Sequence, residues 1–320
     1  MMKPLIQVED LKILFETGTQ TIHAVNGVSF DIMPGETFGL VGESGCGKSV
    51  TALSLMRLVP SPPGKIVSGR ILWEGRDLLS MTVPELIRLR GREIGMIFQE
   101  PMSSFNPVQT IGSQIAEVLA IHEKMPPKAA RDRVVEILTK VGFNNPSRQF
   151  DAYPHQLSGG MRQRAMIAMA LICRPKLLIA DEPTTALDVT IQAQILELLR
   201  QLQEETGMAI LMITHNLGIV AEMADRVAVM YGGKLVEMAP VRSLFHEARH
   251  PYTVGLLKSI PGYDKTGELY AIPGQIPDMA ELPSGCLFAP RCERAKDICR
   301  NRCPELKEVV PGHQASCWLY

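Results

Sequence analysis

Apolar and polar residues alternate along several stretches of the first hundred residues, as in strands that bury one face. A turn at 33–36 (MPGE) separates two of these stretches, and a Pro- and Gly-rich loop at 61–64 separates two others. The pattern predicts strands at 4–15, 24–32, 37–41, 69–73 and 93–98, and a short helix at 84–90.

After Gln99 the periodicity becomes helical, and it stays so, between Pro-containing loops, through most of 101–155. This segment is typical of a helical insertion. An α/β pattern then resumes, with helices predicted at 159–172 and 191–204, strands at 177–180 and 209–214, and a hairpin at 225–238. Strands that alternate with helices predict an α/β fold with a largely parallel sheet covered on both faces.

Beyond residue 240 prolines and cysteines increase and the regular periodicity fades. We therefore expect a first domain at 1–240, with its helical subdomain at about 101–160, and a C-terminal extension at 241–320. The formal net charge is −1, which favours neither nucleic acid nor anionic lipid as a partner. The chain has no apolar run of membrane-spanning length and no signal-like start, so a cytosolic protein is expected.

The segment 42–49 reads GESGCGKS and fits the phosphate-loop pattern G-x-x-x-x-G-K-[ST], between a predicted strand and a predicted helix. Glycines let successive backbone N–H groups approach phosphate oxygens, and the helix N-terminus adds positive charge. Lys48 would lie on the outer phosphates and the Ser49 hydroxyl would bind Mg²⁺. The alternative is a chance Gly-rich turn, which the matching strand and helix disfavour.

Two more stretches carry candidate chemistry. The apolar strand at 177–180 ends in Asp181 and Glu182, which beside a Mg-nucleotide would hold Mg²⁺ and orient or deprotonate the attacking water. The segment 157–163 reads LSGGMRQ, in which Ser158 and two glycines open a helix and offer a second anion site. Taken alone, the first stretch is equally a solvated strand end and the second an ordinary helix cap.

Together these motifs resemble the nucleotide-binding subunits of ABC transporters over residues 4 to about 240. The resemblance rests on GESGCGKS, Gln99, LSGGMRQ, LLIADE at 177–182, TALD at 185–188 and His215, in the family's order. It implies a P-loop NTPase fold: a RecA-like core with an antiparallel β subdomain and a helical subdomain.

The same resemblance implies a role for each matching residue. Gln99 would reach Mg²⁺ and the attacking water, Glu182 would be the catalytic base, and His215 and Lys48 would contact the γ-phosphate. Phe15 would stack on adenine, with His23 a weaker candidate, and Asp188 would lie in the loop that crosses to the partner subunit. The implied nucleotide contacts are Phe15, Gly42, Glu43, Ser44, Gly45, Cys46, Gly47, Lys48, Ser49 and Val50. The implied ligands of Mg²⁺ are Ser49, Gln99 and Asp181. The ATP site of a partner subunit would be completed by Ser158, Gly159, Gly160 and Gln163.

The family's architecture implies two ATPase subunits arranged head to tail, which bury two ATP molecules, close on binding and reopen on hydrolysis. The segment 101–107 would grip a membrane permease. Two permeases, a second ATPase (a paralogue, with a homodimer as the alternative) and an extracytoplasmic solute-binding protein are the implied partners, with the chain at the cytoplasmic face of the membrane.

Cys46 lies next to Lys48 and the helix N-terminus, which favour its thiolate. We therefore consider the hypothesis that a thiol reagent inactivates the ATPase and that Mg-ATP protects it. The alternative is that a small residue simply fits at this place.

Five of the seven cysteines lie in the last 35 residues, and in a reducing compartment such a cluster indicates a metal or metal–sulfur site. HPYT at 250–253 and GCLFAPRC at 285–292 resemble D-type ATP-binding subunits of the oligopeptide/dipeptide/nickel importers, some of which hold a [4Fe–4S] cluster. By position the ligands would be Cys286, Cys292, Cys299 and Cys317, with Cys303 an extra thiol. Their wide spacing favours a cluster over zinc, which stays the alternative, as do unligated cysteines.

The sequence thus predicts an ATPase subunit that energises the import of dipeptides or oligopeptides. Nickel, glutathione and oligosaccharide are alternative solutes. The competing class is a soluble ABC ATPase acting on nucleic acid or ribosomes, which the single motif set and the lack of basic excess disfavour.

Overall fold

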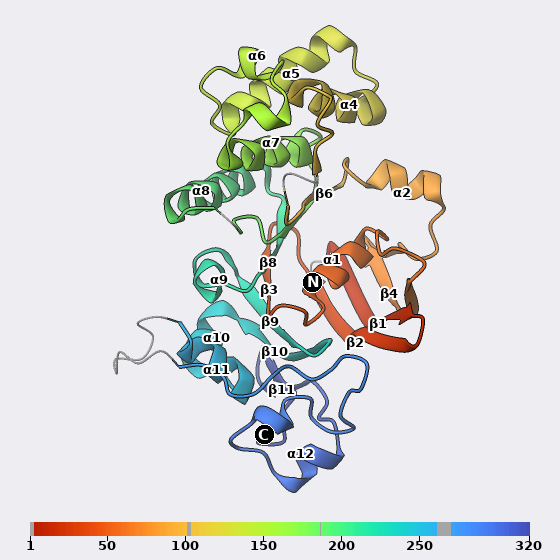
Figure 1. Cartoon of the computed structure of the whole chain (residues 1–320), viewed down its shortest axis with the longest axis vertical. Helices are drawn as coiled ribbons and strands as arrows, with labels where there is room; N and C mark the ends of the chain where they lie inside the picture. Colours follow the sequence, from red (N-terminus) through yellow and green to blue (C-terminus); the bar gives the residue numbers. More distant parts are fainter. Residues whose placement is uncertain (1–2, 101–103, 186, 261–269) are drawn as a thin grey trace. The chain divides into compact units, whose positions relative to one another are not determined.

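The computed structural model describes residues 3–100, 104–185, 187–260 and 270–320 (Figure 1). The chain divides into two compact units, one made of Met1–Ser80 with Met212–Tyr320 and the other of Met81–Leu211. The boundary between them falls within strand β8 (Ala209–Thr214).

An antiparallel sheet forms the N-terminal part of the first unit. Its strand order is β2-β1-β4-β5, and its strands are β1 (Ile6–Thr17), β2 (Gln20–Ile32), β4 (Gly64–Trp73) and β5 (Arg76–Asp77). Alternate residues such as Ile6 and Val8 are buried, as the period-two pattern predicts. Both early strands are therefore confirmed, although β1 is shifted by two residues and β2 begins four residues earlier than predicted.

A second sheet of the same unit carries the phosphate-loop segment. Strand β3 pairs in parallel with β9, whereas β10 and the two tail strands continue the sheet in antiparallel fashion in the order β11-β12-β10-β9-β3. The bounds are β3 (Thr37–Val41), β9 (Arg226–Tyr231), β10 (Lys234–Pro240), β11 (Lys307–Val310) and β12 (His313–Ala315). The sheet is thus mixed, because a hairpin turns the chain back after β9 and the tail adds antiparallel strands to its edge.

The helices of the first unit are α1 (Lys48–Leu55), α9 (Leu217–Met223), α10 (Val241–Glu247), α11 (Pro251–Lys258) and α12 (Asp297–Asn301), with a 3₁₀ turn, η2 (Ala289–Arg291). Three of these helices, α1, α9 and α10, follow strand ends, and the others lie in the tail. Tail and sheet share one core, in which Tyr231, Leu244, Tyr252 and Phe288 belong to the same buried cluster. The cysteine-bearing tail is therefore built onto the sheet through β9 and β10 side chains.

The second unit contains a short parallel pair of strands and the helical insertion. Strand β6 (Ile94–Ile97) pairs in parallel with β7 (Leu177–Asp181), and β7 is followed in the sheet by the first residues of β8. The helical elements are α2 (Val83–Leu89), α4 (Ile111–Glu123), α5 (Pro127–Lys140), α6 (Pro146–Gln149), η1 (Pro154–Gln156), α7 (Gly159–Leu171) and α8 (Val189–Thr206). Helices α4, α5 and α7 contact one another, which confirms a helical insertion after Gln99.

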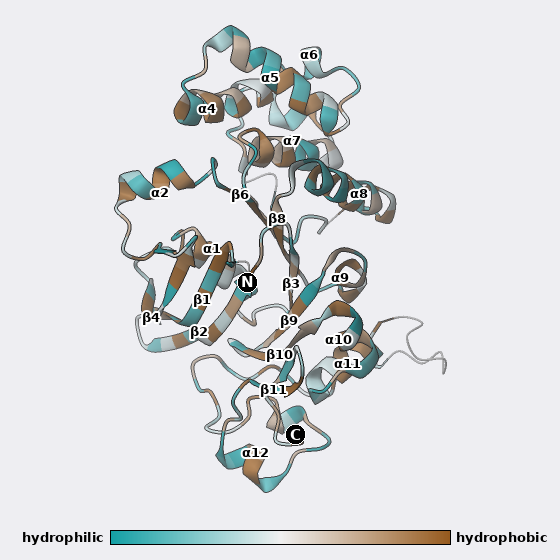
Figure 2. Ribbon diagram, turned by 180° about the vertical axis from the view of Figure 1, so that it is seen from behind, coloured by the Kyte–Doolittle hydropathy of each residue, from teal (hydrophilic) through white to brown (hydrophobic). Residues whose placement is uncertain are grey.

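Amphipathic helices close this unit. Helix α8 buries Ile195, Leu196, Leu198, Leu199 and Leu202, which lie along one side of the helix. In Figure 2 both α5 and α8 carry hydrophilic and hydrophobic colours, as expected of helices with one face in the core. Within the described ranges, no helix is both long and apolar enough to cross a bilayer.

Candidate functional site

Strand β3 leads directly into the phosphate loop, and helix α1 begins at its end. Two loop glycines lie tightly against neighbouring backbone. A Cβ atom at Gly47, whose φ is 104°, would lie 2.3 Å from the carbonyl oxygen of Ala24, and one at Gly42 would lie 2.2 Å from that of Met230. Only glycine lets the loop approach strands β2 and β9 this closely.

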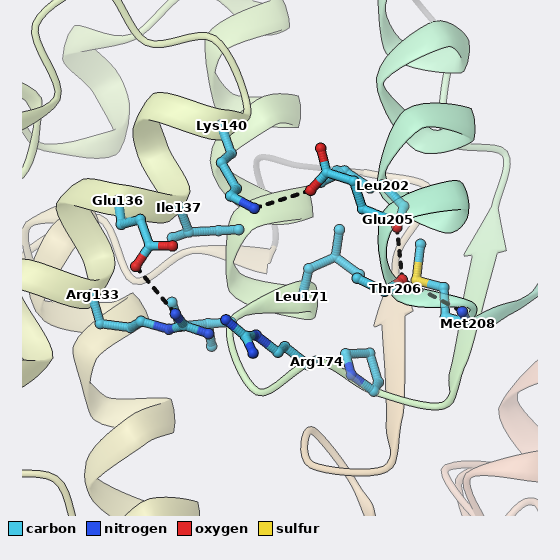
Figure 3. Close-up of a pocket in the computed structure, with 12 residues that line it drawn as sticks. Arg133, Glu136, Ile137, Lys140, Leu171, Arg174, Leu202, Glu205, Thr206 and Met208 are labelled. Carbon is cyan, nitrogen blue, oxygen red and sulfur yellow. Dashed lines mark hydrogen bonds and ion pairs between the residues drawn. The ribbon is translucent and has the colours of Figure 1, made fainter.

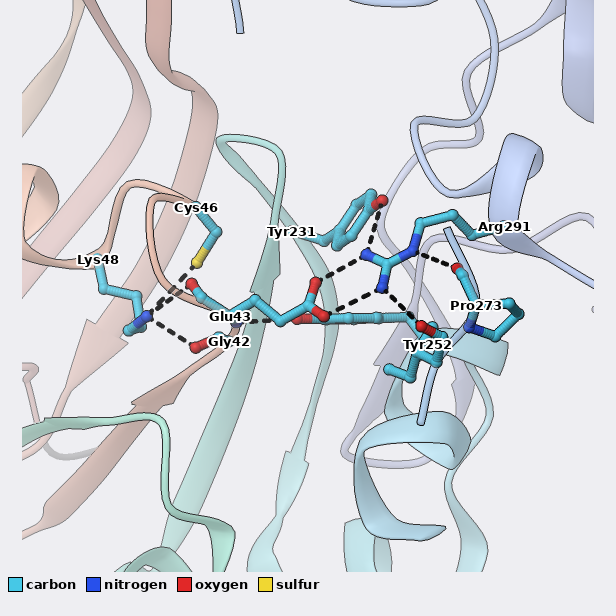
Figure 4. A network of polar contacts seen from close by, with 9 residues as sticks. Gly42, Glu43, Cys46, Lys48, Tyr231, Tyr252, Pro273 and Arg291 are labelled. Carbon is cyan, nitrogen blue, oxygen red and sulfur yellow. Dashed lines mark hydrogen bonds and ion pairs between the residues drawn. The ribbon is translucent and has the colours of Figure 1, made fainter. Parts of the chain in front are cut away.

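The Lys48 side chain curls back inside the loop, where it is only 5% exposed. Its Nζ donates to the carbonyl oxygens of Gly42 (2.7 Å) and Glu43 (2.9 Å) and lies 3.7 Å from Cys46 Sγ (Figure 4). Ser49 and Val50 follow in the first turn of α1 and are half-buried. The ammonium is thus held inside the loop by two of the loop's own carbonyl oxygens.

The expectation of a low pKa for Cys46 is wrong. The thiol is fully buried, and this burial raises its pKa despite the opposing charge of Lys48. Desolvation has the largest effect on the pKa of this thiol, ahead of the charge of Lys48. Cys46 is therefore a small buried residue rather than an activated thiolate.

Phe15 and His215 also belong to the first unit. Phe15 is half-buried on β1, opposite Ile22 of β2, and His23 lies next along β2. His215 is exposed and follows β8 directly, before α9, whose first turn is capped by the Asn216 side chain. The predicted roles of Phe15 beside the adenine and of His215 beside the γ-phosphate stay predictions.

In the second unit, the predicted catalytic carboxylate has a defined set of partners. Glu182 follows β7 with a left-handed φ of 47°. Its Oε2 accepts hydrogen bonds from Gln99 Nε2 (3.1 Å) and from Thr185 Oγ1 (2.8 Å), while Asp181 is buried beside it. Non-glycine residues in this backbone region are strained, and such strain is concentrated at functional sites. Gln99 and Glu182, 83 positions apart, are thus brought together as the resemblance implies.

The signature segment opens helix α7. Ser158 is its N-cap and accepts from the backbone N–H of Met161 at 3.3 Å, so the first orphan donors of this helix lie beside Gly159 and Gly160. Gln163 is buried, and its Nε2 donates to the Pro183 carbonyl at 2.6 Å. Gln163 therefore ties this helix to the segment after Glu182 rather than facing outward.

Asp188 caps the next helix in the same way, since its Oδ1 accepts from the Ile191 N–H at 3.0 Å. The sequence did not point to Gln192, whose Nε2 donates to the carbonyls of Thr184 and Leu187. Gln192 braces the segment between Glu182 and Asp188. In the sequence, Gln192 looks like any polar residue in the first turns of a helix, so no motif identifies it.

The segment predicted to grip a permease is described only from Ser104 onward, since 101–103 lie outside the described residues, as does Ala186 of TALD. Asn106 exchanges hydrogen bonds with the Gln114 side chain of α4: its N–H donates to Oε1 at 2.9 Å and its carbonyl accepts from Nε2 at 3.0 Å. The end of this segment is thus anchored to the helical insertion.

Four of the tail cysteines line one small pocket, which also contains His250 and Phe288. They are Cys286, Cys292, Cys299 and Cys317. The fifth, Cys303, is not among these lining residues, and its thiol lies 3.3 Å from Lys234 Nζ. The pocket therefore includes the four cysteines that the resemblance implied, and Cys303 lies close enough to act electrostatically on Cys286.

These thiols are not arranged around a single point. Among the described residues, no three His, Cys, Asp or Glu side chains form a group that could hold one metal ion. Burial, with a smaller contribution from the neighbouring thiols, raises the pKa of Cys286 to about 11, and burial also raises the pKa values of Cys292 and Cys317. The expected metal centre is thus not supported by donor geometry.

Another cavity, of about 40 Å³, lies in the second unit between α5, the end of α7 and α8 (Figure 3). Its walls include Arg133, Leu171 and Met208, and an ion pair between Lys140 and Glu205 lies beside it. None of the predicted site residues lines it, and its volume suits only a water molecule or two.

Comparisons with known proteins agree with these features. A family model described as "ABC transporter" matches residues 25–185, and one described as "Oligopeptide/dipeptide transporter, C-terminal region" matches 236–299. The chain is 55% identical over 320 residues to the oligopeptide transport ATP-binding protein AppD of Bacillus subtilis, covering 100% of this chain and 98% of the relative. It is 50% identical to the dipeptide transport ATP-binding protein DppD of the same organism, covering 99% and 95%.

Among solved structures, the fold is similar to that of the ATP-binding cassette MJ0796 in a dimeric post-hydrolysis state bound to ADP and Pi. The TM-score is 0.67 and the identity 27%, with 74% of this chain and 99% of that chain covered. CbiO1 of Clostridium perfringens, part of the ABC transporter complex CbiONQ, gives a TM-score of 0.65 at 29% identity, with 76% of this chain and 91% of that chain covered.

Because Cys46 is buried with a raised pKa, we expect a maleimide to modify it at least about tenfold more slowly in the native full-length chain than in denaturant at neutral pH. Peptide mapping by mass spectrometry measures both rates, and Cys46→Ser serves as the control that lacks the modified peptide. Rapid native labelling of Cys46, with loss of ATPase activity that Mg-ATP prevents, would restore the activated-thiolate hypothesis.

Proposed function

This chain belongs to the ABC transporter family, and on that premise we propose that it is the ATP-hydrolysing subunit of a membrane importer for dipeptides or oligopeptides. The observations that carry the ATPase part are a complete phosphate loop in the first unit and, within the second unit, a carboxylate, Glu182, that Gln99 and Thr185 hold. The tail match and the relatives named for peptide transport support the solute class.

The proposed chemistry assigns one task to each group. Lys48 and the loop N–H groups bind the phosphates of ATP, and Ser49, Gln99 and Asp181 provide the oxygens that suit Mg²⁺. Glu182 orients or deprotonates the attacking water, and its bonds from Gln99 and Thr185 hold the carboxylate in one direction. His215 supplies a contact to the γ-phosphate, and Phe15 stacks on the adenine.

The proposed working unit is a head-to-tail pair of ATPases. The exposed start of α7, with Ser158 as its N-cap and two glycines without side chains, offers N–H groups to the ATP of the partner subunit. Asp188 lies at the cap of α8 and would contribute the crossing loop. Binding of ATP closes the pair and hydrolysis reopens it, which drives the permeases.

Two permease subunits, a second and paralogous ATPase, and an extracytoplasmic solute-binding protein are the proposed partners, at the cytoplasmic face of the membrane. Nickel, glutathione or an oligosaccharide remain alternative solutes, because the binding protein and the permease would select the cargo. The domain division at residue 240 is part of this proposal, and the matches at 25–185 and 236–299 support it.

For the tail we propose that Cys286, Cys292, Cys299 and Cys317 hold a [4Fe–4S] cluster. The support is that these four thiols, and not Cys303, line one pocket. A cluster offers four separate iron atoms, so its ligands need not converge on one point, whereas a zinc ion requires convergence. The wide spacing of the four cysteines along the sequence favours the cluster over zinc.

The cluster proposal predicts that full-length protein purified anaerobically is brown and contains about four iron and four sulfide ions per chain. Cys303→Ser should keep the colour, because this thiol lies outside the pocket, whereas Cys292→Ser should lose most of the iron. Metal and sulfide analysis with visible absorption provides the measurement. Colourless protein that contains zinc would contradict the cluster.

The ATPase proposal predicts that Glu182→Gln lowers the hydrolysis rate at least about 100-fold while Mg-ATP binding is retained, because glutamine keeps the shape but cannot accept a proton. Lys48→Ala should instead lose binding. Steady-state phosphate release and equilibrium ATP binding separate the two effects.

Glu205→Gln is the matched control, since Glu205 is an exposed acid of the same unit whose partner is Lys140, and its rate should stay that of wild type. A Glu182→Gln variant that hydrolyses ATP at the wild-type rate would remove Glu182 from the mechanism.

A further inference from the structure

The tail reaches the phosphate loop through Glu43, the second residue of the loop. All three polar parts of Glu43 have partners: its carboxylate pairs with Arg291, its N–H donates to Tyr252 Oη at 2.9 Å, and its carbonyl accepts from Lys48 at 2.9 Å (Figure 4). A loop residue held at each polar group has little freedom to move. Two of these three partners come from beyond residue 240.

The pair between Arg291 and Glu43 is bidentate. Nη1 and Nη2 donate to the two carboxylate oxygens at 2.8 and 3.1 Å, and the side chains are only 5% and 26% exposed. The other guanidinium donors bond to the carbonyls of Ile272 and Pro273 and to the Tyr231 hydroxyl. Every N–H of this guanidinium therefore has an acceptor, so it is fixed in one orientation.

The remaining contact to the loop is held by an aromatic group. Tyr252 is fully buried, and its ring centroid lies 4.6 Å from that of Tyr231 and 5.4 Å from that of Phe288. Burial raises the pKa of Tyr252 far above its usual range, which keeps the hydroxyl neutral and able to accept from the Glu43 N–H. Packing thus fixes the acceptor as firmly as the ion pair fixes the carboxylate.

Arg291 itself lies in a tight turn bounded by two cysteines. Ala289 N–H donates to the Cys286 carbonyl at 2.9 Å, Arg291 N–H to the Phe288 carbonyl at 3.0 Å, and Cys292 N–H to the Ala289 carbonyl at 3.3 Å. The guanidinium is therefore placed by the backbone that also places two of the pocket thiols.

From this geometry we infer that Arg291 is a positioning residue for ATP binding: it neutralises and holds Glu43, so that the phosphate loop of this chain depends on its own C-terminal tail. The inference rests on the proposed ATPase site. Without the guanidinium, the carboxylate would remain unpaired in a loop that must accept a polyanion, and it would repel the phosphates as well as release the loop. Removing both charges would abolish the repulsion.

The test compares equilibrium dissociation constants for Mg-ATP in the full-length chain. Arg291→Met should weaken binding about tenfold, and Arg291→Lys less, because lysine keeps the charge but not the fork. The double variant Arg291→Met with Glu43→Gln should return to within about threefold of wild type. KM for ATP should follow these changes, while kcat changes less.

Arg300→Met is the matched control, because Arg300 is an exposed tail arginine, and it should bind ATP like wild type. Unchanged affinity in Arg291→Met, or a double variant as weak as the single one, would overturn the inference; the second result would mean that only tail packing was lost. Failure of the proposed function has a different signature, since the wild-type chain would then bind no ATP.

Discussion

The phosphate loop is set by close backbone packing that only glycine permits. Gly42 and Gly47 place the loop directly against carbonyl oxygens of β9 and β2, respectively. The ammonium group of Lys48 then donates hydrogen bonds to carbonyl oxygens of the same loop. A larger residue at Gly42 would push the loop off β9, and one at Gly47 would push it off β2. The conformation that presents N–H groups to a phosphate therefore depends on the pairing of β3 with β9 and on the neighbouring antiparallel sheet.

The same strand joins the loop to the tail. Tyr231 ends β9 and packs in the core that contains Tyr252 and Phe288, so the residues after 240 complete the sheet and its core instead of hanging from it. The turn that carries Arg291 is bounded by Cys286 and Cys292, so one short segment both lines the sulfur pocket and contacts the phosphate loop. A tail too small to form its own core thus becomes ordered by covering another one.

Many secondary-structure elements and several site residues could be predicted from local sequence patterns, because they depend on residues that are close in sequence. The strand–loop–helix at the phosphate loop, the helix caps at Ser158 and Asp188 and the carboxylates after β7 all depend on nearest neighbours in the sequence. The contact of Gln99 with Glu182 could be predicted only through the family resemblance.

Interactions between residues that are far apart in sequence could not be predicted from local patterns. The Arg291–Glu43 pair joins positions 248 apart, and the burial of Cys46, which reverses its expected pKa shift, is decided by the packing of distant strands. The sequence also did not predict that the sheet is mixed, because β11 and β12 are short strands of the tail that add to an existing edge of the sheet. Charge and spacing alone cannot weigh desolvation against a nearby cation, which needs the folded environment.

The central claim is that this chain energises a membrane importer, and affinity purification from native membranes tests it most directly. The tagged full-length chain would be extracted gently, and the proteins that accompany it identified by mass spectrometry. The account predicts two polytopic permeases and a second ATPase in stoichiometric amounts. Recovery of ribosomal or nucleic-acid components in place of membrane proteins would contradict it.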